Sequence, residues 1–239
     1  MGNDNLRFVC HAHAFFPPKV QFFHTSSILK HHTFNNQHSV FHETRTLRKL
    51  ATPTTTKTTS IKHENVIKLL NTFSDHREAY LVFEDPGEPL LKVCDQLNRA
   101  EGPLLNLFKQ LLNGVKFIHE KNILHLGIHS ESVSVLEKSN GLCVKITGFR
   151  GSIDLDFEPA LSEVTTGILS NSKLSVKCLE YSAPELVKMS SPCKVSDVWS
   201  CGVLLYEMVS GIVPFSGSTR MELISRICQS KVCFPEERF

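Results

Sequence analysis

The feature that most constrains the fold is the stretch 195–209, which is apolar on nearly every side of a helix. Such a helix is stable only when neighbouring elements cover it. A second segment, 104–120, repeats apolar residues at helical spacing, at Leu104, Leu107, Phe108, Leu111, Leu112, Val115 and Ile118. This spacing predicts a long, largely buried helix. The two segments together predict a mainly helical C-terminal part with residues 195–209 inside it.

The sequence before these helices favours strands. Residues 66–73 and 78–84 are rich in strand formers and flank a polar turn, so they predict an antiparallel hairpin. A second hairpin is predicted over 133–136 and 143–146, because Asn140-Gly141 is typical of a tight turn. Residues 43–50 predict a short amphipathic helix. The expected fold class is α+β, with a partial small β lobe before the helical lobe.

Composition narrows the class of protein. The 26 Lys and Arg residues nearly balance 24 Asp and Glu, and a net charge of +2 gives no strong attraction to nucleic acid. The eight cysteines form no Cys-x-x-Cys pair, which is typical of reduced thiols in an intracellular protein. No run reaches the roughly 18 apolar residues of a membrane span. We therefore expect a cytoplasmic protein with no membrane span and no nucleic-acid partner.

The chain divides near residue 43. Residues 1–42 hold seven of the twelve histidines and show no sustained apolar period, so they predict a His-rich, poorly defined segment. The spacing of Cys10 and its neighbouring histidines matches no zinc module, and we expect no metal there. Residues 51–60 are rich in threonine and predict an insertion. The remaining domain, 43–239, divides into a remnant β lobe, 43–86, and an incomplete helical lobe, 87–239.

Three motifs point to a known family. Residues 182–185 read Ser-Ala-Pro-Glu, residues 196–203 read Ser-Asp-Val-Trp-Ser-Cys-Gly-Val, and residues 211–215 read Gly-Ile-Val-Pro-Phe. In this order and spacing they resemble the Ala-Pro-Glu motif, the central-helix motif and the following loop of eukaryotic protein kinases. The run 63–70 is similar to the fourth strand of that family, and the whole resembles its Ser/Thr, calcium/calmodulin-dependent-like branch. The resemblance covers residues 43–239 and implies a kinase-like fold truncated at both ends.

The resemblance locates the family's chemistry at residues 125–132 and 147–150. A kinase uses an Asp as proton acceptor, an Asn for metal and an Asp before Phe-Gly for Mg²⁺. Gly127, Ser132 and Gly148 occupy these three positions. His129 stands at the usual Lys, and Arg150 follows Phe149 where the last Gly is usual. We therefore expect degenerate catalytic and metal loops, no competent catalytic residue, no bound Mg²⁺ and impaired phosphotransfer.

The nucleotide site departs from the family as well. No Gly-x-Gly-x-x-Gly loop is present, and neither Lys19 nor Lys30 lies in a Val-Ala-x-Lys string. Phe83, Glu84 and Asp85 form a hinge-like run. Pro86 follows at the position where the family offers a backbone N–H to adenine, and proline has none. The expectation is that ATP binding is weak or absent.

The resemblance also implies structural roles that survive. His125 and Phe149 are expected to stack in an internal hydrophobic column, and Asp197 is expected to accept N–H bonds from the catalytic-loop backbone. The full set of such residues is Glu43, Leu47, Leu69, His125, Phe149, Glu185 and Asp197. Core packing and helix capping alone would also explain them. The family partner of Glu185 is an Arg that would lie beyond Phe239.

Three functions remain open. The first is a catalytically impaired, pseudokinase-like domain that binds a protein partner as a scaffold or regulator. The second is a weakly active or nucleotide-binding Ser/Thr kinase, in which Lys145, Arg150 and His129 form a cationic site. The third is a non-functional fragment of a larger kinase. The sequence identifies no partner and no oligomeric state.

Overall fold

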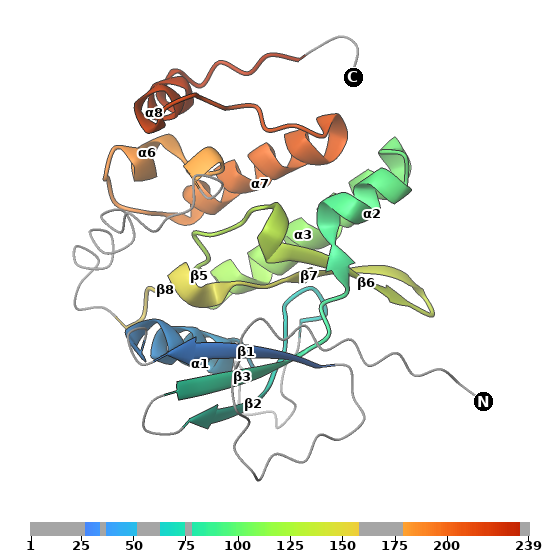
Figure 1. The fold of residues 1–239 in the computed structure, drawn as a ribbon, viewed down its shortest axis with the longest axis vertical. Coiled ribbons are helices and arrows are strands. Elements are labelled where there is room, and N and C mark those ends of the chain that lie inside the picture. Colours follow the sequence, from blue (N-terminus) through green and yellow to red (C-terminus); the bar gives the residue numbers. More distant parts are fainter. Residues whose placement is uncertain (1–26, 34–36, 52–62, 75–77, 158–178, 235–239) are drawn as a thin grey trace.

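The structure is a computed structural model, and it describes residues 27–33, 37–51, 63–74, 78–157 and 179–234. The smaller lobe is an antiparallel sheet with the strand order β1-β3-β2 and one helix, α1, beside it (Figure 1). Its elements are β1 (Ser27–Thr33), α1 (Gln37–Ala51), β2 (Leu69–Ser74) and β3 (Glu78–Glu84). The second and third strands form the hairpin that the sequence predicts.

The larger lobe is mainly helical. Its helices are α2 (Leu90–Gln96), α3 (Glu101–Glu120), α6 (Pro184–Val187), α7 (Lys194–Ser210) and α8 (Arg220–Gln229). Its short strands are β4 (Glu88–Pro89), β5 (Ile123–Leu124), β6 (Val133–Lys138), β7 (Gly141–Ile146) and β8 (Ile153–Asp154). Two 3₁₀ turns, η2 (Ser130–Ser132) and η3 (Phe149–Gly151), carry the predicted catalytic and metal loops. The α+β fold class with a small β lobe and a helical lobe is confirmed.

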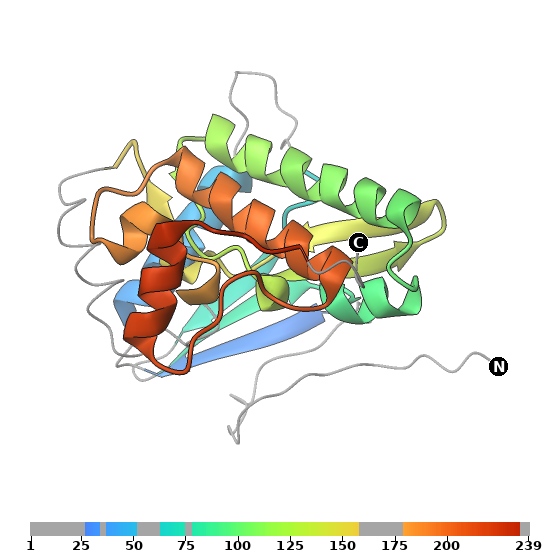
Figure 2. The ribbon, with the colours of Figure 1, turned by 90° about the horizontal axis from the view of Figure 1, so that it is seen from above.

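Helix α7 lies at the centre of the larger lobe, with α3 alongside it (Figure 2). Cys201, Leu204 and Met208 of α7 are almost fully buried, as expected for a helix that is apolar nearly all round. The helix ends at Gly211, whose φ of 78° suits a residue without a side chain. Arg99 Nη1 donates to the last-turn carbonyls of Glu207, at 2.9 Å, and Met208, at 2.5 Å. These bonds fix the position of the end of α7.

The N-terminal elements differ from the prediction. Helix α1 begins at Gln37 rather than at Glu43, and β1 lies within the segment 1–42, where no period is visible. Strand β1 pairs with β3 along its whole length, so its backbone hydrogen bonds come from a partner distant in sequence. The pattern of apolar residues within one strand cannot reveal which distant strand it pairs with. The first residue of the predicted insertion 51–60 lies in α1, and the rest of the insertion is outside the described residues. Residues 1–26 and 34–36 of the His-rich segment, and residues 75–77, 158–178 and 235–239, are outside them as well.

Within the part of the chain that the structure describes, no helix is both long enough and apolar enough to cross a membrane.

Candidate functional site

The predicted catalytic loop is anchored to α7 by one buried carboxylate. The His125 N–H donates to Asp197 Oδ2 at 2.9 Å, and the Leu126 N–H donates to Asp197 Oδ1 at 2.7 Å. The Nε2 of His119, on α3, lies 2.8 Å from Asp197 Oδ2. Asp197 has no exposed surface, so these bonds replace its hydration. The backbone that precedes residue 127 is therefore held in one position.

The ring of His125 joins the catalytic loop to the metal loop. Its Nε2 lies 2.9 Å from the carbonyl oxygen of Thr147, and its Nδ1 accepts the Gly127 N–H at 3.2 Å. These partners fix the neutral tautomer with the proton on Nε2. The ring also meets Phe149 edge to face, with 4.7 Å between centroids. Complete burial lowers the pKa of His125, because the charged ring would lose its hydration.

This burial predicts a pH dependence of stability. The pKa of His125 is lower in the folded chain than the usual value of about 6.5. Below about pH 6.5 the unfolded chain therefore binds a proton that the folded chain does not, and the free energy of unfolding falls as pH falls. The free energy of unfolding of the native chain and of His125→Gln can be measured by urea titration between about pH 7.5 and 5.5. It should depend less steeply on pH in the variant, by at most about 1.4 kcal/mol per pH unit.

His63, whose pKa burial also lowers, is present in both proteins and serves as an internal control. Equal slopes in the two proteins would contradict this account of His125.

The two predicted metal-ligand positions are neighbours. A Cβ built on Gly148 would lie 3.4 Å from Cβ of Ser132, so side chains at these positions face each other. Ser132 Oγ accepts the His129 N–H and donates to the His129 carbonyl, both at 2.9 Å. Gly127 contributes no side chain. The three positions thus supply one hydroxyl, already bonded, whereas Mg²⁺ favours carboxylate and phosphate oxygens.

The other predicted loop residues have local roles. His129 Nδ1 accepts the Glu131 N–H at 3.2 Å and caps the turn η2. Arg150 lies in η3 and is exposed. Among the residues that the structure describes, no group of three or more His, Cys, Asp or Glu is placed to hold a metal.

The predicted hydrophobic column lies in the core between the lobes. Leu47 and Phe149 are buried in one core cluster, against which Leu69 packs partly exposed. Glu43, one turn before Leu47 on α1, is also buried, at 1% exposure. Helix α1 contacts the turn η3 directly, and Thr46 Oγ1 accepts a bond of 3.1 Å from Ser152 Oγ. The structure therefore brings α1, the metal loop and His125 together.

Sequence reasoning missed an ionic contact at the same place. Lys49 of α1 donates to Asp154 and, at 2.8 Å, to Asp156 just after β8. Arg45 Nη2 lies 3.7 Å from Asp154. The hydrogen bond from Lys49 is the main cause that lowers the pKa of Asp156. These pairs hold α1 to the segment after the metal loop, and no local sequence signal connects residues about a hundred positions apart.

The hinge-like run holds a second unforeseen ion pair. Phe83 is buried, Asp85 Oδ1 accepts the Gly87 N–H at 2.9 Å, and Pro86 is buried. Glu84 Oε1 lies 2.7 Å from Lys145 Nζ, whose side chain is 5% exposed. Lys145 is therefore paired with the hinge rather than presented to solvent with Arg150 and His129.

Glu185 finds its partners near the start of α7. Ser196 Oγ donates to Glu185 Oε1 at 2.5 Å, and Cys193 Sγ lies 4.0 Å from the same oxygen. The pairing of Glu185 with a family Arg stays a prediction.

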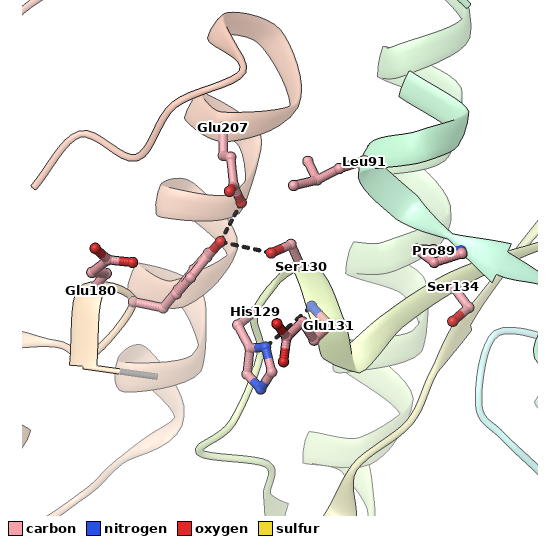
Figure 3. A pocket seen from close by; sticks show the side chains of 9 residues that line it. Pro89, Leu91, His129, Ser130, Glu131, Ser134, Glu180 and Glu207 are labelled. Carbon is pink, nitrogen blue, oxygen red and sulfur yellow. Dashed lines mark hydrogen bonds between the residues drawn. The ribbon is translucent and has the colours of Figure 1, made fainter. Parts of the chain in front are cut away.

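A pocket of about 350 Å³ opens beside the catalytic loop (Figure 3). The Tyr181 hydroxyl donates to Glu207 Oε2 of α7 and lies 3.0 Å from Ser130 Oγ. Burial, together with the bond to Glu207, raises the pKa of Tyr181, so the phenol stays protonated. The pocket is lined by Pro89, Leu91, His129, Ser130, Glu131, Ser134, Glu180, Tyr181 and Glu207. Three acidic residues from three separate segments thus line one pocket, a convergence that sequence spacing does not show.

The protein kinase domain model matches residues 28–237, which is most of the chain. The chain belongs to the protein kinase family. This match confirms the predicted family, and it begins within the segment 1–42 that the sequence analysis kept separate.

Curated relatives of the chain are kinases by name. Myosin light chain kinase A of Dictyostelium discoideum is 30% identical over 179 residues, covering 74% of this chain and 57% of that protein. CBL-interacting serine/threonine-protein kinase 9 of Arabidopsis thaliana is 28% identical, covering 73% of this chain and 37% of that protein. Calcium-dependent protein kinase 4 of Plasmodium berghei is 26% identical, covering 75% and 32%. The chain thus spans between about a third and three fifths of the length of these relatives.

Proposed function

We propose that this protein kinase domain is catalytically impaired and acts as a protein-binding scaffold or regulator. The observation that carries the proposal is a contrast within the catalytic loop: its backbone is held in place, whereas the side chains for phosphotransfer are missing. Asp197 holds the catalytic-loop backbone through two N–H bonds, yet the neighbouring positions Ser132 and Gly148 bring no carboxylate together. The loop keeps its shape and lacks the groups that would use it.

The missing side chains would impair two parts of phosphotransfer, namely proton acceptance from the substrate hydroxyl and Mg²⁺ binding. Gly127 has no side chain to accept a hydroxyl proton, and a positioned base is usually worth about 10²–10⁴ in rate. A kinase would hold Mg²⁺ through an Asn and an Asp at positions 132 and 148, and Ser132 and Gly148 offer neither group. Bound Mg²⁺ would supply positive charge to stabilise the transferred phosphoryl group, and the donors present do not fit that ion. The proposal therefore includes weak or absent ATP binding and no Mg²⁺ requirement.

The hinge supports the nucleotide part of the proposal. Pro86 has no N–H to give, and Lys145 is already paired with Glu84 at 2.7 Å. A phosphate that recruited Lys145 would have to break a largely buried ion pair, which is costly because Glu84 would lose its partner. These hinge features disfavour nucleotide binding. We propose that the domain instead binds proteins, and that it does so in the cytoplasm.

The acidic pocket suggests the chemistry of a partner. Glu131 and Glu180 line it together with Glu207, whose carboxylate is oriented by the Tyr181 hydroxyl. Carboxylates in a partly enclosed site attract a cation more strongly than carboxylates on an open surface. We propose that the pocket receives an Arg or Lys side chain from an extended segment of the partner.

A peptide titration tests this pocket. A short peptide with two adjacent arginines should bind the full chain, and the same peptide with glutamines should bind at least about fivefold more weakly, because it lacks the positive charge. Glu131→Gln and Glu180→Gln should each weaken binding of the arginine peptide by about threefold to tenfold. Fluorescence anisotropy at about 0.1 M salt would measure these affinities.

The matched control is Glu101→Gln, an exposed carboxylate at the start of α3 that does not line the pocket. The same native preparation should transfer no phosphate from ATP to a version of the arginine peptide that carries a serine as acceptor, with Mg²⁺ or Mn²⁺. Equal affinity for both peptides would overturn the pocket assignment, and metal-dependent phosphotransfer by the native chain would overturn catalytic impairment.

A weakly active kinase remains the second candidate, and one observation favours it. His125 and Phe149 keep their edge-to-face contact, and α1 is packed against the metal loop, so the framework around the lost side chains is intact. Phosphotransfer in the assay above would select this candidate.

A further inference from the structure

Arg99 lies in the short connection between α2 and α3, and its side chain ties this connection to the end of α7. Its Nη1 donates to the carbonyl oxygens of Glu207, at 2.9 Å, and Met208, at 2.5 Å. Its Nη2 donates to Asp95 Oδ1 of α2 at 2.6 Å. A cation is also favoured at this place because the C-terminal end of a helix dipole is negative. The guanidinium therefore joins the last turn of α7 to α2.

The backbone around Arg99 is held in an uncommon conformation. Asn98 and Arg99 both lie in the left-handed region, with φ of 49° and 50°. The Arg99 N–H donates to the carbonyl of Cys94 at 2.9 Å, which closes the last turn of α2. Residues other than glycine seldom adopt this conformation, and surrounding contacts must hold them in it. The three hydrogen bonds of the guanidinium are contacts of this kind.

Gly211 leaves room for the guanidinium of Arg99. This glycine follows α7 with a φ of 78°. A Cβ built on it would lie 3.2 Å from Arg99 Nη2 and 3.3 Å from Arg99 Cζ. Contacts this short are tighter than ordinary van der Waals contact, so an alanine at position 211 would displace the guanidinium or strain the turn. The side chain at 99 and the bare backbone at 211 thus fit each other.

The bonds of Arg99 connect two sides of the acidic pocket. Glu207, whose carbonyl Arg99 holds, lines the pocket from α7. Leu91 lines it from α2, the helix that carries Asp95 (Figure 3). The Tyr181 hydroxyl donates to the Glu207 carboxylate, so Glu207 is held at its backbone and at its side chain by two different elements. The place of this carboxylate relative to α2 therefore depends on Arg99.

We infer that Arg99 is a positioning residue of the acidic pocket, which acts through Glu207 and thereby raises the affinity for a basic segment. The inference rests on the proposed pocket for an Arg or Lys side chain, and it adds a residue that does not line that pocket. Charge and position act in opposite directions, because the positive charge of Arg99 repels a cationic ligand. Loss of the charge alone would strengthen binding, whereas loss of the positioning weakens it.

Substitutions at Arg99 and Gly211 test the inference with the arginine peptide of the pocket assay. Arg99→Gln should weaken binding of that peptide to the full chain by about threefold to tenfold, although it removes a positive charge. Arg99→Lys keeps the charge but lacks the planar fork that reaches several acceptors, so it should weaken binding by about twofold to fivefold. Gly211→Ala should weaken binding as well, because it crowds the guanidinium. Fluorescence anisotropy at about 0.1 M salt measures these affinities.

A double-mutant cycle shows whether Arg99 acts through Glu207. In a Glu207→Gln background, Arg99→Gln should change the affinity by less than about twofold, because the group that Arg99 positions no longer carries a charge. In a Glu131→Gln background, Arg99→Gln should keep its full effect, because Glu131 belongs to the turn η2 rather than to α7. A residue that only stabilised the fold would have the same effect in both backgrounds.

The charge control is Lys92→Gln on α2. The Lys92 side chain is 51% exposed, pairs with Glu88 and does not line the pocket. This change removes one positive charge from the same helix, and it should leave the affinity unchanged or slightly higher. Circular dichroism shows whether each variant is folded. If Arg99→Gln is not folded, Arg99→Lys takes its place in every comparison.

Two results would overturn the inference and leave the pocket in place. One is unchanged or tighter binding of the arginine peptide by the folded Arg99 and Gly211 variants. The other is an equal effect of the Arg99 substitution in the Glu207→Gln and Glu131→Gln backgrounds. Failure of the native chain to prefer the arginine peptide over the glutamine peptide would instead overturn the pocket and the role of Arg99 together.

Discussion

Replacing Asp197 with alanine should lower the free energy of unfolding by about 3–5 kcal/mol, a large part of the roughly 5–15 kcal/mol that stabilises an ordinary domain. The carboxylate is fully buried and accepts the N–H groups of His125 and Leu126 as well as a bond from His119. Alanine would leave these donors buried and unsatisfied, at about 1–3 kcal/mol for each group. Urea unfolding followed by circular dichroism would measure the change.

Two controls separate the anchor from a general effect of losing a carboxylate. Asp197→Asn keeps one oxygen acceptor and should cost less than alanine, because at least one loop N–H stays bonded. Asp95→Ala removes an exposed carboxylate whose partner, Arg99, retains its bonds to the end of α7. That change should cost at most about 1 kcal/mol. An alanine variant at 197 as stable as Asp95→Ala would show that the loop does not depend on this anchor.

The sequence predicted those parts of the site whose residues lie within short motifs. Asp197 and His125 belong to recognisable strings. Asp197 accepts the N–H groups of residues 125 and 126, and the His125 ring lies edge to face with Phe149. Ser132 lies just before the first strand of one hairpin, and Gly148 lies shortly after its second strand. The turn of this hairpin was predicted from Asn140-Gly141. Because the two strands pair in register, the segments that flank them come close together.

The parts that the sequence did not predict depend on contacts between distant residues. Strand β1 pairs with β3 across some fifty intervening residues, and the Lys49–Asp154 and Lys145–Glu84 pairs cross between elements. From the sequence alone, a charged residue on the polar face of an amphipathic helix gives the same pattern whether its side chain contacts solvent or an oppositely charged residue of another element. Lys145 is an example. The sequence allowed this lysine to belong to a cationic nucleotide site, whereas in the structure it is paired with Glu84 of the hinge.

The α1 contacts bear on how an impaired kinase domain could still serve as a scaffold. Lys49 and Arg45 hold α1 to Asp154, and Thr46 bonds Ser152, all from one helix to one short segment. Buried and partly buried pairs of this kind favour one arrangement over alternatives, because a displaced α1 would leave Asp154 buried and unpaired. These side chains therefore hold α1 of the smaller lobe against the segment that follows the metal loop.

Restoring the lost side chains should return metal-dependent nucleotide binding. In the triple variant Gly127→Asp, Ser132→Asn and Gly148→Asp, Mg²⁺ with ATP should raise the melting temperature, and phosphotransfer should exceed that of the native chain by about 10²-fold or more. The backbone permits these changes. A Cβ at Gly127 meets its nearest atom at 3.7 Å, and Gly148 has a φ of 82°, a left-handed conformation that Asp tolerates better than most residues.

The matched control carries Asn at 127, 132 and 148, so that it has the same added bulk without the carboxylates. It should resemble the native chain in both assays, because neutral amides neither neutralise Mg²⁺–phosphate nor accept the hydroxyl proton. If the folded triple variant gained no Mg²⁺-dependent stabilisation, these three positions would not be sufficient to restore the chemistry, and the loss would extend to the hinge and the missing glycine loop. If the amide control gained activity equally, packing in the loops rather than missing charge would be the cause of impairment.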